Sequence, residues 1–295
     1  MREQKFIITC DSACDMSKEF IDSLGVYVIP FEYISNDKNN TEAYLDTMDA
    51  KDYKSFYDNM RNGIVYKTTQ INVDRYLDFF HGLKDLNKPI LHISLCAALS
   101  STIENAHYVA KELKKEGMNI YVVDGKIASL GLGLLINKAC KLRDEEKDIE
   151  EVKSIIENTA DNMGVYYTTN TLTYFARGGR LSKTSSFIAS ALRINVILDC
   201  NKNGGLRTIA KCHGRNKAKK YILDNIKENV INPQEQALYV CASDCKEEAV
   251  TFAASLVKEI GFKYYILTDM GPIIGAHAGP GLMAFFFESK SDIRK

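Results

Sequence analysis

The chain lacks what membrane, secreted and nucleic-acid-binding proteins need. Its 295 residues include 38 basic and 38 acidic side chains, so the formal net charge is zero and a basic footprint for nucleic acid is absent. No apolar run approaches the roughly 20 residues that span a bilayer. Residues 1–5 lead directly into a strand-like segment without the pattern of a secretory signal. We therefore expect a cytoplasmic protein that does not bind nucleic acid.

Two common catalytic signatures are also missing. No Gly-x-x-x-x-Gly-Lys-Ser/Thr loop occurs, and the pair Gly131 and Gly133 lacks the third glycine of a dinucleotide fingerprint. No serine lies in a Gly-x-Ser-x-Gly elbow. An esterase or thioesterase that uses Ser100 and His277 stays open as an alternative, because a serine and a histidine can meet in a fold without that motif.

Eight cysteines without a signal sequence predict reduced thiols rather than a disulfide framework. Cys10 and Cys14 share the three-residue spacing of Cys241 and Cys245, and this spacing falls in the range of structural zinc ligands. No knuckle glycine or flanking turn supports a metal site. We expect free thiols and no bound metal, with zinc on these four cysteines as the alternative.

The first half of the chain alternates strand and helix signals. Strands are predicted at 6–9, 26–31, 89–95 and 120–123, and helices at 17–24, 50–62, 100–116 and from 129 onward. This rhythm is typical of a parallel sheet in a three-layer α/β/α domain. Open sheets of this kind bind ligands beyond the carboxyl ends of their strands, where residues 9–12, 94–101 and 124–129 lie.

The second half has a different pattern. Strands are predicted at 165–168, 196–199, 206–211, 238–242 and 264–268, with a hairpin turn at 203–205 and helices at 152–162, 185–192, 216–228 and 246–259. We predict a two-layer α/β domain with a mixed sheet. The domain boundary is expected near Ala160, which gives an N-terminal domain of residues 1–160, a C-terminal domain of residues 161–295, and a ligand tunnel between them.

Residues 271–281 read Gly-Pro-Ile-Ile-Gly-Ala-His-Ala-Gly-Pro-Gly. Glycine tolerates backbone angles that other residues avoid, and proline fixes φ. Apolar segments on both sides place this run inside a folded domain, so we predict a shaped loop that presents His277 to a small ligand. The alternative is a tight turn whose histidine only caps it.

Two further segments are rich in hydroxyl groups and are predicted as loops. They are residues 67–70 (Lys-Thr-Thr-Gln) and residues 94–102 (Ser-Leu-Cys-Ala-Ala-Leu-Ser-Ser-Thr). Ser100 or Ser101 lies where a helix begins, and a helix N-terminus favours an anion. Ser101 and Glu104 also have the spacing of a capping box. A cap and a ligand site are compatible if different serines serve them.

A basic segment lies at residues 174–183, where Arg177 and Arg180 flank a glycine pair. Arginine binds a carboxylate or phosphate through two parallel hydrogen bonds. The alternative is a solvated basic turn.

In their order along the chain, these segments resemble the DegV family of bacterial fatty-acid-binding proteins. Residues 8–15 are similar to its opening Asp-Ser loop, 67–70 to its Lys-Thr-Ser-Gln, and 94–106 to its Ser-rich loop and helix. Residues 123–133 resemble its Asp-Ser-x-x-Ala-Ser-x-Gly-x-Gly, and the Arg-Gly-Gly-Arg-x-Ser and histidine segments agree closely. The resemblance covers nearly the whole chain.

The resemblance implies a DegV-like carrier without catalysis of its own. Such a protein holds one long-chain fatty acid in a tunnel and presents it to a separate ATP-dependent kinase, which makes the acyl phosphate. By match, Thr68, Ser100 and His277 would bind the carboxylate, with Thr69 and Ser101 as additional headgroup contacts. Arg180 and Arg215 would face the kinase or its phosphate. The implied protein is a monomer that needs no cofactor and contacts membrane surfaces only transiently.

Several positions depart from the family pattern. Ser101 stands where glycine is usual, Ile71 where proline follows the glutamine, and Cys10 and Cys14 replace threonine and alanine. Cys96 is also unusual in the Ser-rich loop. These departures leave the preferred acyl chain open. They also keep open a regulatory protein that retains the fold but not the ligand.

Overall fold

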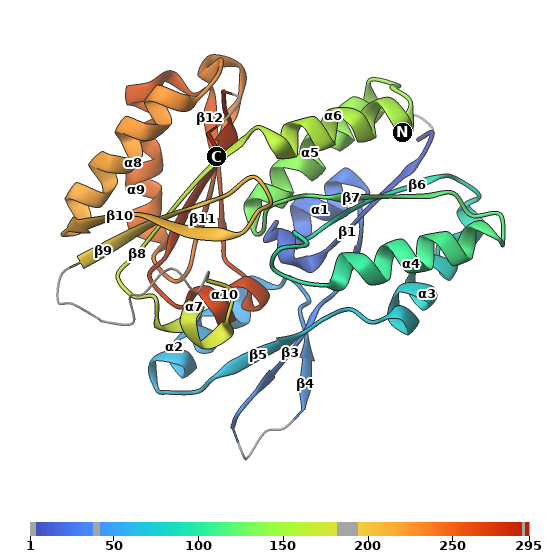
Figure 1. Cartoon of the computed structure of the whole chain (residues 1–295), viewed down its shortest axis with the longest axis horizontal. Helices are drawn as coiled ribbons and strands as arrows, with labels where there is room; N and C mark the ends of the chain where they lie inside the picture. Colours follow the sequence, from blue (N-terminus) through green and yellow to red (C-terminus); the bar gives the residue numbers. More distant parts are fainter. Residues whose placement is uncertain (1–3, 38–41, 182–193, 291–292, 295) are drawn as a thin grey trace.

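The computed structural model describes residues 4–37, 42–181, 194–290 and 293–294. Figure 1 shows two sheets that face each other across α5 and α6, with a smaller sheet extending below them. The predicted combination of a parallel sheet and a mixed sheet is confirmed. No helix in the described part of the chain combines the length and the apolar character that crossing a membrane requires.

The first sheet is parallel, with strand order β2-β1-β6-β7. Its strands are β1 (Ile7–Asp11), β2 (Tyr27–Ile29), β6 (Ile90–Ser94) and β7 (Ile120–Asp124). The order reverses between β1 and β6, which is where ligands bind in open parallel sheets. The carboxyl ends meet as predicted, because the hydroxyl of Ser94 and the N–H of Leu95 both donate to Asp11 Oδ2, at 3.2 and 2.7 Å.

Helices cover both faces of this sheet. They are α1 (Lys18–Leu24), α3 (Val73–His81), α4 (Thr102–Lys114), α5 (Leu130–Asp144) and α6 (Ile149–Asp161). Buried side chains of α3 and α4 pack on one face, and those of α1, α5 and α6 pack on the other. Asp11 caps a short turn, η1 (Ser12–Cys14), and Ser17 caps α1.

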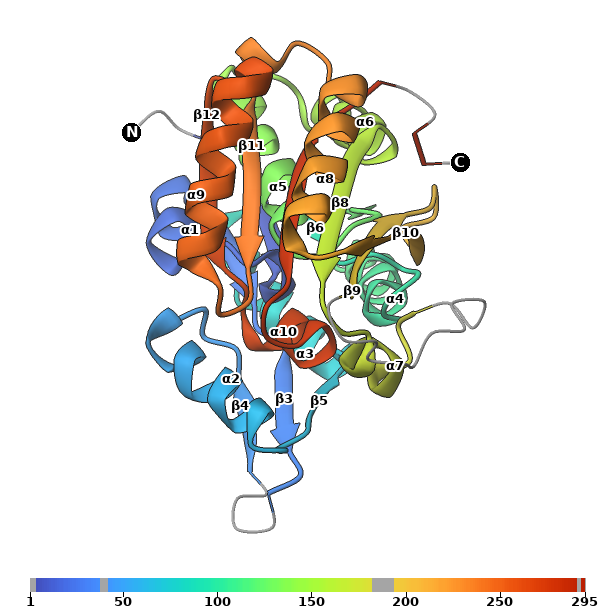
Figure 2. The ribbon, with the colours of Figure 1, turned by 90° about the vertical axis from the view of Figure 1, so that its left-hand side faces the viewer.

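The second sheet is mixed, with order β10-β9-β8-β13-β11-β12, and only β11 and β12 are parallel neighbours. Its strands are β8 (Met163–Thr169), β9 (Ile194–Cys200), β10 (Leu206–His213), β11 (Ala237–Ala242), β12 (Tyr264–Asp269) and β13 (Met283–Glu288). Helices α8 (Arg215–Asn229) and α9 (Lys246–Leu256) lie side by side on one face (Figure 2). The predicted hairpin at 203–205 joins β9 to β10. The predicted helix at 185–192 lies outside the described residues.

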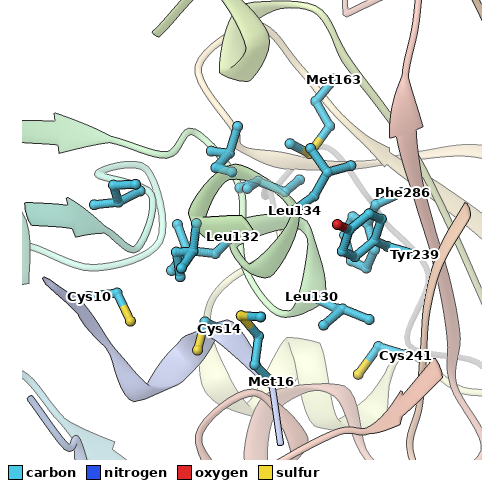
Figure 3. Packing of buried hydrophobic residues seen from close by; sticks show 14 of the residues in the cluster. Cys10, Cys14, Met16, Leu130, Leu132, Leu134, Met163, Tyr239, Cys241 and Phe286 are labelled. Carbon is cyan, nitrogen blue, oxygen red and sulfur yellow. The ribbon is translucent and has the colours of Figure 1, made fainter. Parts of the chain in front are cut away.

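Helix α5 fills the space between the two sheets. Eleven of its fifteen residues are buried, and the same apolar cluster contains residues of both halves of the chain. A Cβ at Gly131 would lie 2.6 Å from Phe286, and one at Gly133 would lie 2.7 Å from Met16, so the two glycines let α5 approach its neighbours closely. Figure 3 shows the leucines of α5 among Met16, Cys241 and Phe286. The halves of the chain therefore share one core.

A third, antiparallel sheet was not anticipated from the sequence. It has the order β4-β3-β5 and consists of β3 (Glu32–Ser35), β4 (Ala43–Leu45) and β5 (Tyr66–Thr69). Helix α2 (Tyr53–Arg61) packs on it through Phe56, which contacts Tyr33 and Tyr66. The remaining elements are α7 (Thr173–Gly178), α10 (Pro272–Ala278) and the short turns η2 (Ala50–Asp52), η3 (Lys84–Leu86), η4 (Pro233–Glu235) and η5 (Val257–Gly261).

Candidate ligand-binding site

A cavity of about 640 Å³ lies where the loops after β6 and β7 meet β5, α7, α10 and the β9–β10 hairpin. This volume is typical of small-molecule sites. The lining is mainly apolar and includes Phe31, Leu95, Leu99, Ala128, Phe175, Leu206, Met270, Ile273, Ile274 and Leu282. Polar side chains from β5, α10 and the loop before α4 also border it: Thr68, Thr69, Gln70, Ser100, Ser101 and His277.

Thr68 and His277 form a hydrogen-bonded pair at this cavity. The Oγ1 atom of Thr68 lies 2.9 Å from Nε2 of His277, although the residues are 209 positions apart in the chain. Residues 67–70 were predicted as a loop, but Tyr66–Thr69 is strand β5, paired with β3. Because side chains alternate along a strand, Thr68 is half-buried while Lys67 and Thr69 are exposed.

His277 lies on a helix rather than on the predicted loop. Gly271 is the N-cap of α10, and Pro272 occupies its first turn, where a missing N–H costs nothing. A Cβ at Gly275 would lie 2.5 Å from the hydroxyl oxygen of Tyr57. The glycines therefore serve close packing, and the helix continues through them until Gly279 ends it with a φ of +75°. This corrects the expectation of a loop at 271–281.

The imidazole of His277 is held neutral. Burial, together with the positive charge of Arg180, lowers the pKa of His277 to about 4. Its Nδ1 is buried and has no hydrogen-bond partner among the described residues, and it lies so close to Gly178 that a Cβ there would be 2.2 Å away. Hydrogen on Nε2 leaves no buried N–H unpaired. Nε2–H then donates to Thr68, and the Thr68 hydroxyl hydrogen is available to a ligand.

Ser100 and Ser101 have separate roles. The Ser100 hydroxyl donates to Thr102 Oγ1 at 3.0 Å, and Ser100 borders the cavity. Ser101 makes no side-chain cap on α4; its hydroxyl donates to Oε1 of Gln70 at 2.5 Å. The predicted capping box with Glu104 is therefore not formed, because Gln70 from the neighbouring β5 segment takes the hydroxyl. This bond ties the start of α4 to the strand that carries Thr68.

The two candidate arginines have different surroundings. Arg180 is exposed at the edge of the cavity, where its Nη1 donates to the Gly178 carbonyl at 2.6 Å and its Nε to the Leu99 carbonyl at 3.4 Å. Arg215 does not line the cavity. Its guanidinium is half-buried and bonds Glu248 at 3.0 Å and the Gly281 carbonyl at 3.0 Å. Arg180 is thus free to meet a ligand or partner, whereas Arg215 ties α8 to α9 and to the end of the histidine segment.

The four cysteines weighed as zinc ligands are not gathered into a metal site. All eight cysteines are free thiols, and the described ranges contain no group of three or more His, Cys, Asp or Glu side chains that could hold a metal. Cys10 and Cys14 are buried next to each other, and this contact and burial raise the pKa of Cys10. Cys241 instead lies 3.7 Å from Asp15, and Cys245 donates to the Leu282 carbonyl.

Comparison with known proteins agrees with the motif order. A sequence model of the DegV family, described as uncharacterised, matches residues 5–290. A DegV domain-containing protein of Clostridium perfringens is 33% identical over 287 residues, which cover 96% of this chain and 97% of that protein. The chain belongs to the DegV family.

Solved DegV structures share the fold over nearly the full length. A DegV lipid-binding protein from Thermotoga maritima superimposes with a TM-score of 0.85 at 24% identity, covering 97% of this chain and 99% of that one. A DegV family protein from Thermus thermophilus, described by its fatty acid binding, gives a TM-score of 0.86 at 21% identity, covering 97% and 100%.

Sequence reasoning missed the contacts of three polar residues at or behind this site, Ser129, Asp15 and Gln70. Ser129 borders the cavity, and its hydroxyl donates to Asp15 Oδ2 at 2.5 Å. Both residues lie in segments that resemble the family motifs, yet a spacing of 114 positions gives no sign that they meet. Gln70, the partner of Ser101, was likewise quoted only as part of a motif.

Proposed function

We propose that this chain is a carrier that binds one long-chain fatty acid in the cavity and presents its carboxylate to a separate ATP-dependent kinase. The acyl chain would lie along the apolar lining. Thr68, Ser100 and His277 would hold the carboxylate, and Thr69 and Ser101, which also border the cavity, would be additional headgroup contacts. The kinase would transfer the phosphoryl group in its own active site.

The Thr68–His277 pair at the edge of an apolar cavity is the observation that carries this proposal. A carboxylate that leaves water needs hydrogen-bond donors, since an unpaired buried charge is very costly. The Thr68 hydroxyl, polarised by His277, would supply one donor, and the Ser100 hydroxyl would supply a second by turning from Thr102 to the ligand, both without a permanent ion pair. A headgroup held by neutral groups stays available to a phosphoryl donor.

The acyl chain supplies most of the affinity. A buried CH₂ group gains about 0.8 kcal/mol, so a chain of about 14 to 18 carbons outweighs the few hydrogen bonds at its head. The family relatives support this class of ligand, because the Thermotoga maritima protein is described as lipid-binding and the Thermus thermophilus protein as fatty-acid-binding.

Arg180 is the residue that we propose to face the kinase. It is exposed next to the headgroup end, and its charge reaches His277. A cation at this position favours an incoming phosphate. For Arg215 the contacts with Glu248 and Gly281 favour a structural role, and any effect of Arg215 on the kinase would act through the shape of α8.

The hydrolase alternative has the wrong geometry. The hydroxyl of Ser100 is bonded to Thr102, and Nε2 of His277 is paired with Thr68 instead. Within the described residues, Nδ1 of His277 has no carboxylate to orient it, whereas a catalytic triad requires one. The open cavity of about 640 Å³ likewise favours a ligand over a regulatory protein that has lost its site.

Mass spectrometry of an organic extract from the natively purified protein tests the proposal. A near-stoichiometric fatty acid is expected, and its loss is expected in the triple variant Thr68→Val, Ser100→Ala, His277→Gln. The matched control is Thr251→Val with His213→Gln, because both residues are exposed and do not line the cavity. If the protein contains no lipid and takes up no added fatty acid, the proposal is wrong. Turnover of a chromogenic ester that Ser100→Ala abolishes would revive the hydrolase.

A further inference from the structure

Ser129 has an unusual backbone conformation. Its φ of 60° and ψ of −150° fall in a region that is essentially reserved for glycine and costs about 1–3 kcal/mol for other residues. The side chain is buried at the N-cap of α5, and the backbone N–H donates to the Ala13 carbonyl at 2.9 Å. Such strain persists only where the surroundings enforce it. The contact of the hydroxyl with Asp15 is the interaction that a glycine could not make.

Asp15 gathers donors from three separate segments of the chain. Its Oδ2 accepts from Ser129 at 2.5 Å and faces Cys241 Sγ at 3.7 Å, at the end of β11. Its Oδ1 accepts from the N–H of Gly271 at 2.9 Å. The carboxyl group is buried, and burial raises the pKa of Asp15 to about 8 even though these donors act in the opposite direction.

The bond to Gly271 connects this carboxyl group to the ligand site. Gly271 is the N-cap of α10, which carries His277. A Cβ at Gly271 would lie 3.0 Å from Asp15 Oδ1 and 3.0 Å from the hydroxyl of Tyr53, so a larger residue there would push these groups away by a few tenths of an ångström. The preceding carbonyl, of Met270, accepts from Tyr57 at 2.7 Å. The start of α10 is therefore fixed on both sides by groups of the N-terminal half.

We infer that Asp15 and Ser129 are positioning residues that hold α10, and with it His277, at the distance from Thr68 that carboxylate binding requires. This inference rests on the proposed function and adds the residues that preorganise its site. A headgroup site must be held within a fraction of an ångström by groups behind it. The strained backbone of Ser129 allows its hydroxyl, at the wall of the cavity, to reach Asp15.

Two substitutions at Ser129 separate its hydroxyl from its backbone. Ser129→Ala removes the hydroxyl and keeps the strain, whereas Ser129→Gly removes the hydroxyl and relieves the strain. Asp15→Ala removes the acceptor for both α5 and α10. Tyr239→Phe is the matched control, because the Tyr239 hydroxyl accepts from Asn137 at 2.6 Å and so links α5 to β11 without touching α10.

The first readout is the imidazole NMR signal of His277 in ligand-free protein, and the second is the dissociation constant of added palmitate. We expect both Ser129 variants and Asp15→Ala to shift the His277 signal and to weaken palmitate binding at least fivefold, while Tyr239→Phe changes neither. Unchanged His277 signals and affinity in the folded Ser129 variants would overturn the inference. Wild-type affinity in Ser129→Gly alone would also overturn it, because the hydroxyl would then be dispensable.

These two readouts distinguish a failure of the proposed function from a failure of the inference about Asp15 and Ser129. If wild-type protein binds no palmitate, the proposed function fails, while the His277 signal still decides whether Asp15 and Ser129 position α10. If Asp15→Ala does not fold, the two Ser129 variants decide the question by themselves.

Discussion

Two histidines, the buried His92 and the half-buried His277, lie in different surroundings. In the core of the first sheet, both nitrogens of His92 are paired, with Thr9 at 2.9 Å and Tyr76 at 3.3 Å. At the cavity, the part of the chain that the structure describes pairs Nε2 of His277 and leaves its Nδ1 without a partner. Burial lowers the pKa of both, to about 3 for His92 and about 4 for His277. A lowered pKa alone therefore does not distinguish the two histidines; the pairing of their ring nitrogens and the position of His277 at the cavity do.

Replacing each histidine with alanine tests this difference most directly. His92→Ala should lower the free energy of unfolding by about 3–4 kcal/mol, because it leaves a cavity and two unpaired hydroxyls. His277→Ala should cost about 1 kcal/mol, since only one hydrogen bond is lost. Urea unfolding at pH 7 measures both. Equal losses at the two positions would mean that His277 is simply a core residue.

The Thr68–His277 pair should control ligand affinity. Thr68→Val removes a donor to a charged group, worth about 1.5–3 kcal/mol, so palmitate should bind ten- to a hundredfold more weakly. His277→Gln in the same background should add little, because the pair acts as one unit. Titration calorimetry of the four proteins of the cycle checks this. Fully additive effects would show that the two side chains act independently.

Both imidazole rings should make the protein less stable as the pH falls. Each folded-state pKa lies below the ordinary 6.5, so the unfolded chain takes up the proton first as the pH falls. The stability contributed by the neutral ring is therefore present above about pH 6.5 and is lost on acidification, by at most about 1.4 kcal/mol per pH unit. The stability advantage of wild type over His92→Gln should shrink from pH 7 to pH 4.5. A constant advantage across this range would contradict the lowered pKa of His92.

A bound fatty acid should affect the pKa values of the two histidines differently. A carboxylate next to His277 favours the charged ring and should raise its pKa by about one unit, while the pKa of the distant His92 stays unchanged. NMR titration of the imidazole signals with and without palmitate measures this. An unaltered His277 in saturated protein would place the carboxylate elsewhere in the cavity.

The sequence predicted the elements whose signals are local. The parallel strands, α5 and the mixed sheet follow from apolar runs and helical spacing, which need no knowledge of the partner. The errors have tertiary causes. Strand β5 needs β3 as a neighbour, and α10 keeps its glycines because Tyr57 and Asp15 press against them. Neither contact leaves a trace within a short window of sequence.

Part of the candidate site was also predictable, because some of its residues carry a local signal in the sequence. His277 stands out locally because of its glycine-rich surroundings, and the resemblance supplied Thr68 and Ser100. That Thr68 would bond His277, that Gly178 would lie against its ring, and that Ser129 would reach Asp15 depend on contacts across 99 to 209 positions. Only the folded chain brings these groups together.

The buried α5 has a consequence for how such chains diversify. Gly131 of the N-terminal half fits against Phe286 of the C-terminal half, so the contact between the halves depends on residues from each. A gene fusion that exchanged the segment after residue 162 between diverged relatives would bring together surfaces that never evolved against each other. Such an exchange should therefore disturb the packing around α5, even though each half has its own sheet.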